Sequence, residues 1–198
     1  DARHDHHHGD AHTKPFRVES VCLGDGEEEL QRAKHSFPEK MFLAVRGNCD
    51  MASSLPPVGE YEAQGVRFFA LGGGESRDLD TRTPGETWWP QELPSPQELD
   101  RAWENLQAGG NRVDCIFTHE PSAAIRRFLE MDANHVSPLA AFLDRVGRET
   151  AFSHWYFGSL HLDKPIPPRY RAVYQRILPV GPQPQRRGLL GGLLQGRR

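Results

Sequence analysis

The chain has 198 residues, a formal net charge of −3 at pH 7, and mixed charges that make up 26% of its residues. This length is enough for one domain with a substantial core, and there is no basic excess that would indicate nucleic-acid binding. No apolar run approaches the roughly 18 residues of a transmembrane helix and no signal peptide is visible, so we expect no membrane partner and a cytoplasmic location. The three cysteines are odd in number and far apart, which is typical of free thiols in a reducing compartment.

The two ends of the chain differ in composition from its middle. Residues 1–13 contain five of the ten histidines. A tag-like, metal-scavenging or disordered end is one interpretation, and a working part of a site is the other. We therefore expect a His-rich segment over 1–17, a folded domain over 18–180, and a mobile Gly/Pro/Arg-rich tail over 181–198.

Short apolar runs, rich in β-branched and aromatic residues, recur along the domain. Each ends at a polar or glycine-rich break, which favours β-strands. We predict strands over 18–23, 41–45, 66–71, 113–118, 152–157 and 170–178.

Four segments between these runs have helical spacing of apolar residues. The clearest begins at Ser95, because Ser95, Pro96 and Glu98 form a capping-box sequence and Gly109 follows the last turn. Strands that alternate with helices predict an α/β sheet, and a β-rich portion is expected near 56–94, where no helix is evident. The helices are predicted over 27–35, 95–108, 121–131 and 138–146.

Polar side chains follow four of the predicted strands: Asp25, Asn48, His119 and His161. The carboxyl ends of parallel strands converge on the ligand crevice of an α/β sheet, so we expect these four residues to come within a few Å of one another. A carboxylate can bridge two cations, an amide oxygen is a neutral hard ligand, and imidazoles suit Zn, Fe, Ni or Mn. Taken singly, each has a simpler explanation: a helix cap for Asp25 or His119, or a turn for Asn48.

Four short motifs carry these residues in a recognisable order. They are LGDGEEEL (23–30), VRGNCD (45–50), FTHEPS (117–122) and WYFGSLH (155–161). In this order they resemble the motifs of the calcineurin-like metallophosphoesterases, and the resemblance extends over 18–178. It implies a β-sandwich flanked by helices, in α/β/β/α layers, with a dinuclear metal centre at the strand ends. It also implies hydrolysis of a phosphomonoester or phosphodiester, in a small molecule or nucleotide, with two divalent ions among Mn, Fe, Ni and Zn.

The resemblance also implies roles for the four residues. Asp25 would bridge the ions, Asn48 and His119 would hold the second ion, and His161 would hold the first. Two ions about 4 Å apart bind phosphate and lower the pKa of a shared water toward neutral. Because that water is the nucleophile, we expect that Cys49 is not one.

Two motifs depart from the family pattern. Ser159 stands where the pattern has a histidine ligand of the second ion, and a neutral hydroxyl is a poor substitute for imidazole. No apolar strand precedes residue 18, so the first motif, an apolar strand that ends in Asp-x-His, is lost or scrambled here. Asp5 and His7, in Asp5-His6-His7, are the candidate ligands from it, one residue out of step with Gly9. A degenerate relative, which binds metal or phosphate through one ion or none with little turnover, is therefore the alternative to a hydrolase. A weaker alternative is a metal-sequestering protein that relies on residues 4–12.

Overall fold

The structure, a computed structural model, describes residues 18–49, 58–63, 65–76, 79–130 and 136–180. Within those residues it has four α-helices, a two-stranded sheet and a six-stranded mixed sheet, which confirms the predicted mixed α/β class. The His-rich segment, with Asp5 and His7, and the C-terminal tail lie outside the described residues.

The smaller sheet consists of two parallel strands, β1 (Val18–Cys22) and β2 (Met41–Ala44), which α1 (Glu27–Ser36) connects. The larger sheet contains β3 (Val58–Ala63), β4 (Val66–Leu71), β5 (Cys115–Thr118), β6 (His154–Phe157), β7 (Lys164–Ile166) and β8 (Tyr170–Ala172). Its strand order is β3-β4-β5-β6-β8-β7. The four central strands are parallel, and β3 and β7 pair antiparallel at the two edges.

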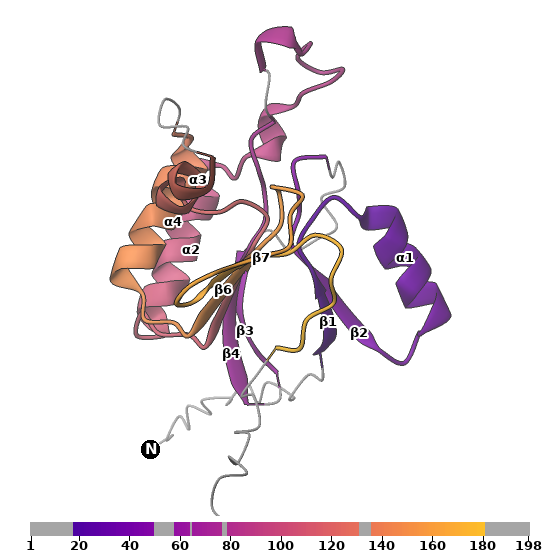
Figure 1. Cartoon of the computed structure of the whole chain (residues 1–198), viewed down its shortest axis with the longest axis vertical. Coiled ribbons are helices and arrows are strands. Elements are labelled where there is room, and N and C mark those ends of the chain that lie inside the picture. Colours follow the sequence, from indigo (N-terminus) through magenta and orange to yellow (C-terminus); the bar gives the residue numbers. More distant parts are fainter. Residues whose placement is uncertain (1–17, 50–57, 64, 77–78, 131–135, 181–198) are drawn as a thin grey trace, which may run out of the picture.

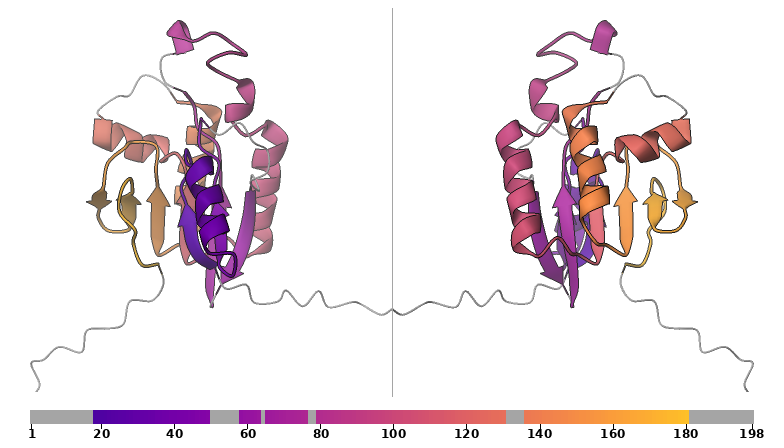
Figure 2. Two further views of the ribbon diagram at one scale, coloured as in Figure 1. Left: turned by 90° about the vertical axis from the view of Figure 1, so that its right-hand side faces the viewer. Right: turned by 90° about the vertical axis from the view of Figure 1, so that its left-hand side faces the viewer.

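Three apolar clusters hold the elements together as layers. The first packs α2 (Pro96–Ala108), α3 (Ala123–Glu130) and α4 (Pro138–Glu149) against one face of the larger sheet. The second lies between the two sheets, and the third lies between the smaller sheet and α1. Figure 1 shows the resulting order of three helices, larger sheet, smaller sheet and α1. In the left view of Figure 2, α1 lies in front of β1 and β2.

The central strand β5 has a sequence that suits its place. All four of its residues are buried: Ile116 faces the helices, whereas Cys115 and Phe117 face the smaller sheet. A strand that is apolar on both faces is stable only where both faces are covered. Its neighbour β6 repeats the pattern, with Trp155 toward the helices and Tyr156 toward the smaller sheet. Each such large buried side chain contributes about 1.5–3 kcal/mol.

The predicted capping box at the start of α2 is confirmed. The Glu98 N–H donates to Ser95 Oγ at 3.3 Å, and the Ser95 N–H donates to Glu98 Oε2 at 2.7 Å. These bonds satisfy two backbone donors that a helix start leaves without an intrahelical partner.

The prediction of one long strand over 170–178 is wrong. The strand ends at Ala172 as β8 and forms a hairpin with β7, which the sequence did not indicate. The reason is Asp163, whose carboxylate accepts the backbone N–H groups of residues 174–176 at 2.9, 3.1 and 3.4 Å. Because these N–H groups donate to a side chain, they are not available to pair with a neighbouring strand, and β8 ends before them. The bond from Tyr174 is the main cause that lowers the pKa of Asp163.

The predicted β-rich portion near 56–94 is only partly confirmed. β3 and β4 form a hairpin, but the described residues that follow it contain two short 3-10 turns, η1 (Leu79–Thr81) and η2 (Pro90–Glu92). This connection projects from one end of the body in Figure 1. Among the helices in the described ranges, none is both long and apolar enough to cross a membrane.

Candidate metal centre

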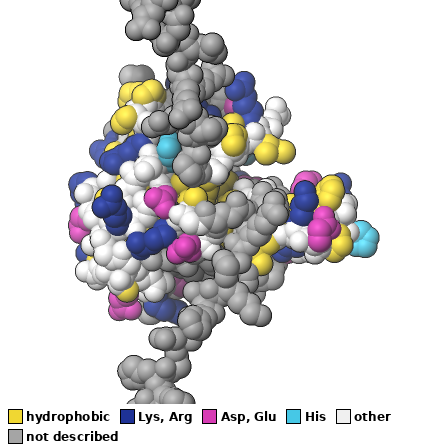
Figure 3. Space-filling view, turned by 90° about the horizontal axis from the view of Figure 1, so that it is seen from below, with side chains coloured by type: hydrophobic (Ala, Val, Ile, Leu, Met, Phe, Trp, Pro, Cys, Tyr) yellow, Lys and Arg dark blue, Asp and Glu magenta, His cyan; other side chains and the backbone are white. Residues whose placement is uncertain are grey.

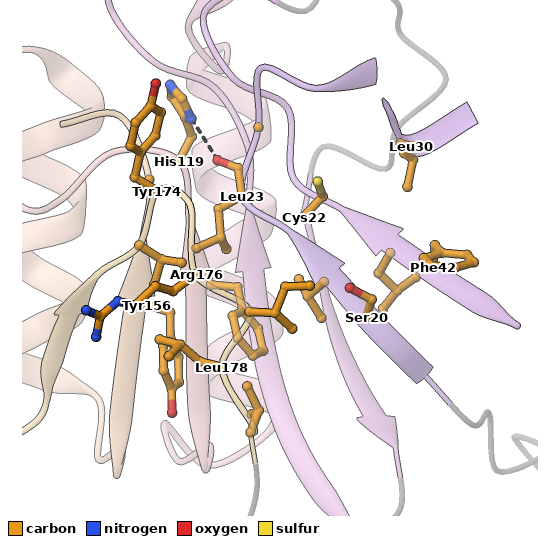
Figure 4. A pocket seen from close by; sticks show the side chains of 18 of the residues that line it. Ser20, Cys22, Leu23, Leu30, Phe42, His119, Tyr156, Tyr174, Arg176 and Leu178 are labelled. Carbon is orange, nitrogen blue, oxygen red and sulfur yellow. Dashed lines mark hydrogen bonds between the residues drawn. The ribbon is translucent and has the colours of Figure 1, made fainter. Parts of the chain in front are cut away.

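The ends of three strands supply the candidate site. Asp25 follows β1, Asn48 follows β2, and His119 comes directly after β5. The His119 imidazole extends toward the end of β1, where it meets the carbonyl of Leu23 (Figure 4). The Gly158 N–H, directly after β6, donates to the His119 carbonyl at 3.0 Å, which ties a further strand end to the same place.

The contact with Leu23 fixes which nitrogen of the His119 ring carries a proton. His119 Nδ1 lies 2.7 Å from the Leu23 carbonyl oxygen, and a carbonyl can only accept a hydrogen bond. Nδ1 is therefore assigned as the N–H. In a neutral ring, His119 Nε2 then has a free lone pair, as a metal ligand requires.

Three glycines enclose the buried His119 ring. A Cβ atom at Gly24 would lie 2.5 Å from Nδ1, one at Gly74 would lie 2.7 Å from Cδ2, and one at Gly158 would lie 3.6 Å from Nδ1. The first two distances are shorter than real Cβ contacts. The close approach of these three loops therefore needs glycine at Gly24 and Gly74, and it holds the ring in one position.

The free nitrogen of His119 faces two oxygen atoms. Nε2 lies 3.0 Å from Asn48 Oδ1 and 3.5 Å from Asp25 Oδ2. The other carboxylate oxygen of Asp25 accepts the Cys49 N–H at 2.9 Å, which fixes the orientation of the carboxylate.

Two residues outside the predicted set decide the orientation of the Asn48 amide. Ser76 Oγ lies 2.6 Å from Glu92 Oε2 and 3.2 Å from Asn48 Nδ2. A carboxylate only accepts, so the single hydroxyl proton of Ser76 goes to Glu92, and the hydroxyl accepts from Asn48. The amide must then turn Oδ1 toward His119. Ser76 and Glu92 are both buried, so this order of donors and acceptors is shielded from water.

A nitrogen lone pair, an amide oxygen and a carboxylate oxygen therefore converge on one point. With neutral His119, none of the three carries a hydrogen toward the others. Such an arrangement is electrostatically unfavourable unless a positive charge lies between the atoms. That charge is either a second proton on the ring or a bound cation.

Helix capping does not account for the positions of Asp25 and His119, whereas Asn48 does lie in a bend. Ser122, and not His119, caps α3, since its hydroxyl accepts a backbone N–H of the first turn at 3.4 Å. Gly26 is the N-cap of α1, and no side-chain bond caps that helix. Asp25 bonds to the loop after β2 instead.

His161 does not join the three-atom cluster in the same way. It is exposed, and its ring stacks on Tyr174 with centroids 5.0 Å apart. It lies with Ser159, Asp25 and His119 in the lining of one cavity of about 1040 Å³. The structure thus brings three of the four predicted residues into contact and places the fourth on the wall of the same cavity.

Three residues of this cavity have strained backbone. Asp25, Ser159 and His161 have φ angles of 52°, 55° and 51°, in the left-handed region that residues other than glycine rarely adopt. Strain of this kind persists only where the surrounding structure enforces it, and it gathers at functional sites.

Glu120 is a further polar residue that the sequence did not indicate. Its carboxylate is buried, accepts the Glu75 N–H at 2.6 Å and pairs with Arg126 at 3.4 Å. Burial is the main cause that raises its pKa, and the Arg126 guanidinium opposes that effect. The bond to Glu75 holds the loop that carries Gly74 against the His119 ring. The run of three glycines over 72–74 is the one sequence signal of this close approach.

Within the described parts of the chain, no group of three or more His, Cys, Asp or Glu residues gathers to hold a metal ion. The cluster above contains one aspartate and one histidine, and its third donor is an asparagine amide. No family model matches the chain, and no curated protein matches it.

Proposed function

We propose that this chain is a metal-dependent phosphoesterase, which holds a divalent ion between Asp25, Asn48 and His119. The observation that carries the proposal is the convergence of three acceptor atoms, with Nε2 at 3.0 and 3.5 Å from the two oxygens. The bond from Nδ1 to Leu23 and the bond from Asn48 Nδ2 to Ser76 turn His119 Nε2 and Asn48 Oδ1 toward the same space as acceptors. Carboxylate, amide oxygen and imidazole together suit Mn, Fe, Ni or Zn.

The residues around the cluster have the tasks that such a site requires. A bound divalent ion would neutralise the charge of a phosphate ester and supply a water of lowered pKa. The Leu23 carbonyl holds His119 in the tautomer that keeps Nε2 available. Ser76 and Glu92 keep the Asn48 oxygen turned toward the same point.

The arrangement of the chain supports the same proposal. The layers of helices and sheets, with polar residues at the strand ends, agree with what the resemblance to calcineurin-like metallophosphoesterases implies. We therefore propose that family for the chain. His161 and Ser159 line the cavity that contains Asp25 and His119, where a phosphate ester would lie.

A metal-binding module with little turnover is the second candidate. It is favoured by Ser159, which lines the cavity with a hydroxyl where the family pattern has an imidazole. The described residues form one three-donor cluster, enough for one ion, whereas the dinuclear chemistry that the family resemblance implies uses two.

Metal content and turnover, measured together, test the proposal. The histidines of residues 1–13 are first replaced by alanine, so that they do not compete for metal. Mn content is then measured by mass spectrometry after gel filtration, and hydrolysis is followed with p-nitrophenyl phosphate and bis-p-nitrophenyl phosphate. The hydrolase proposal predicts bound Mn and turnover, both lost in Asp25→Asn and both kept in the control Asp100→Asn, which is exposed on α2.

The other outcomes select the alternatives. Bound Mn without turnover selects the binding module. Loss of all metal with the N-terminal histidines selects a metal-sequestering protein. Turnover that survives Asp25→Asn contradicts the proposed site.

A further inference from the structure

The cavity beside β1 extends far beyond the polar cluster. Asp25 and His119 lie at one end, and residues 20–23 of β1 and its extension run along it. At about 1040 Å³ it is as large as the largest small-molecule pockets, which reach roughly 1,000 Å³. Most of its lining is apolar, so the polar site explains only a part of it.

The apolar lining comes from two different layers. One wall belongs to the larger sheet and contains Phe68, Phe117 and Tyr156. The opposite wall belongs to the layer of α1 and β2 and contains Leu30, Ala33 and Phe42. In Figure 4, Leu30 and Phe42 lie to one side of β1, and Tyr156 and Leu178 lie to the other.

The space therefore continues the plane of the smaller sheet past β1. Within the described residues, β1 pairs only with β2, so it is an edge strand of that sheet. An exposed edge strand is a template for a further extended segment. A segment here would need apolar side chains on both of its faces, because both walls are apolar.

The last described residues bring the chain to this cavity. Residues 173–180 line it, and three of them have large apolar side chains that are exposed: Tyr174 (53%), Ile177 (98%) and Val180 (44%). Seen from below, apolar side chains show between the two halves of the molecule (Figure 3). The described residues therefore leave the apolar side chains of Tyr174, Ile177 and Val180 exposed to solvent.

We propose that the C-terminal residues 181–198 occupy the cavity as an extended segment beside β1. They follow directly from Val180 in its lining. Their sequence, GPQPQRRGLLGGLLQGRR, contains two leucine pairs separated by two glycines. Residues two apart in an extended chain share a face, so each pair presents one leucine to each wall. The leucines are Leu189, Leu190, Leu193 and Leu194.

The length and the charge of the tail agree with this occupant. The eight residues between Val180 and Leu189 reach up to about 26 Å, enough to turn back into the cavity. An extended segment over 189–194 covers about 20 Å, similar to the roughly 17 Å of the five-residue β1. The tail has four arginines and no acidic residue, so its formal charge is +4. Because the net charge of the whole chain is −3, residues 1–180 together carry −7.

The reactivity of Cys22 reports whether the cavity is covered. Cys22 is half-buried in the lining of the cavity. Cys115 does not interfere, because burial and then the charge of Asp114 raise its pKa to about 11. Cys49 is exposed and is replaced by serine in all samples. The rate of Cys22 modification by dithionitrobenzoate is then measured at pH 8 in the full chain, with unchanged fold verified by far-UV circular dichroism.

Two matched serine variants of the tail test the proposal. Replacing the four leucines by serine should make Cys22 react about tenfold faster, which corresponds to ~1.4 kcal/mol of docking free energy. The control variant, Gln183→Ser, Gln185→Ser and Gln195→Ser, should keep the slow rate. Hydrogen exchange of the β1 amides should likewise become faster in the leucine variant and stay slow in the control variant.

Equal Cys22 rates and equal amide exchange in the three proteins would overturn the proposal. A rate that falls with rising protein concentration, equally in the leucine variant, would assign the cavity to a second copy of the chain and would also overturn it.

Discussion

The substitution Glu92→Gln tests whether Ser76 and Glu92 set the polarity of the proposed metal site. It exchanges one oxygen for an NH₂ group and keeps the shape of the side chain. The Trp89 N–H donates to Glu92 Oε1 at 3.3 Å, so the new amide keeps its oxygen there and turns its NH₂ toward Ser76. Ser76 then accepts that bond, and its own proton is free to go to Asn48.

The Asn48 amide is expected to turn over in response. Its oxygen then faces Ser76, and its NH₂ group donates to His119 Nε2, where a cation would otherwise lie. Changes to such outer partners cost about 10–100-fold in metal affinity, or ~1.4–2.7 kcal/mol. The number of buried hydrogen bonds is unchanged, so the free energy of unfolding should change by less than ~1.5 kcal/mol.

Isothermal titration with Mn²⁺ and urea unfolding measure the two quantities, again without the N-terminal histidines. The control is Glu98→Gln, which makes the same chemical change at a carboxylate that accepts a backbone N–H at 2.7 Å in the capping box of α2. It should leave the Mn²⁺ affinity unchanged. An unchanged Mn²⁺ affinity in Glu92→Gln would refute the proposal that Ser76 and Glu92 keep the Asn48 oxygen turned toward the metal site.

Three further predictions follow from the same structure. Ser159→His should raise Mn content, with at most a small gain in turnover, and an unchanged content by mass spectrometry would remove residue 159 from the site. Gly74→Ala places its Cβ 2.7 Å from His119 Cδ2, so it should cost about 1–3 kcal/mol of stability and weaken Mn²⁺ binding. In the control Gly147→Ala, the nearest atom to the new Cβ is 3.5 Å away, so neither stability nor Mn²⁺ binding should decrease. The pKa of Cys115 rises from 9.0 to about 11 on folding, so between these pH values the unfolded chain loses the thiol proton and the folded chain keeps it. Relative to Cys115→Ala, the wild type should therefore lose about 2 kcal/mol of stability as the pH rises from 9 to 11. A difference in urea unfolding that does not change with pH would contradict this.

Local patterns were enough to predict most of the elements. The capping box at Ser95 and the doubly apolar run of β5 each specify their structure with residues close in sequence. The end of β8 was not predictable in this way. It depends on Asp163, which precedes β7 and bonds to residues 174–176 beyond β8, so this contact links segments that the β7–β8 pairing brings together.

The candidate site was predictable where its residues end strands, as with Asp25, Asn48 and His119. Ser76 and Glu92 lie in the irregular connection after β4, and no periodicity or spacing places them beside Asn48. Their role depends on how that connection folds back over the strand ends. From its position after a strand, His161 was predicted to join the other three residues, but its ring stacks on Tyr174 at the wall of the cavity.

The central claim, that a divalent ion binds between three acceptor atoms, is tested most directly by anomalous diffraction from Mn-soaked crystals. We predict an anomalous peak in contact with Asp25 Oδ2, Asn48 Oδ1 and His119 Nε2, and its loss in crystals of the Asp25→Asn protein. A peak found only at the histidines of residues 1–13, or no peak between the three atoms at saturating Mn²⁺, would contradict the claim.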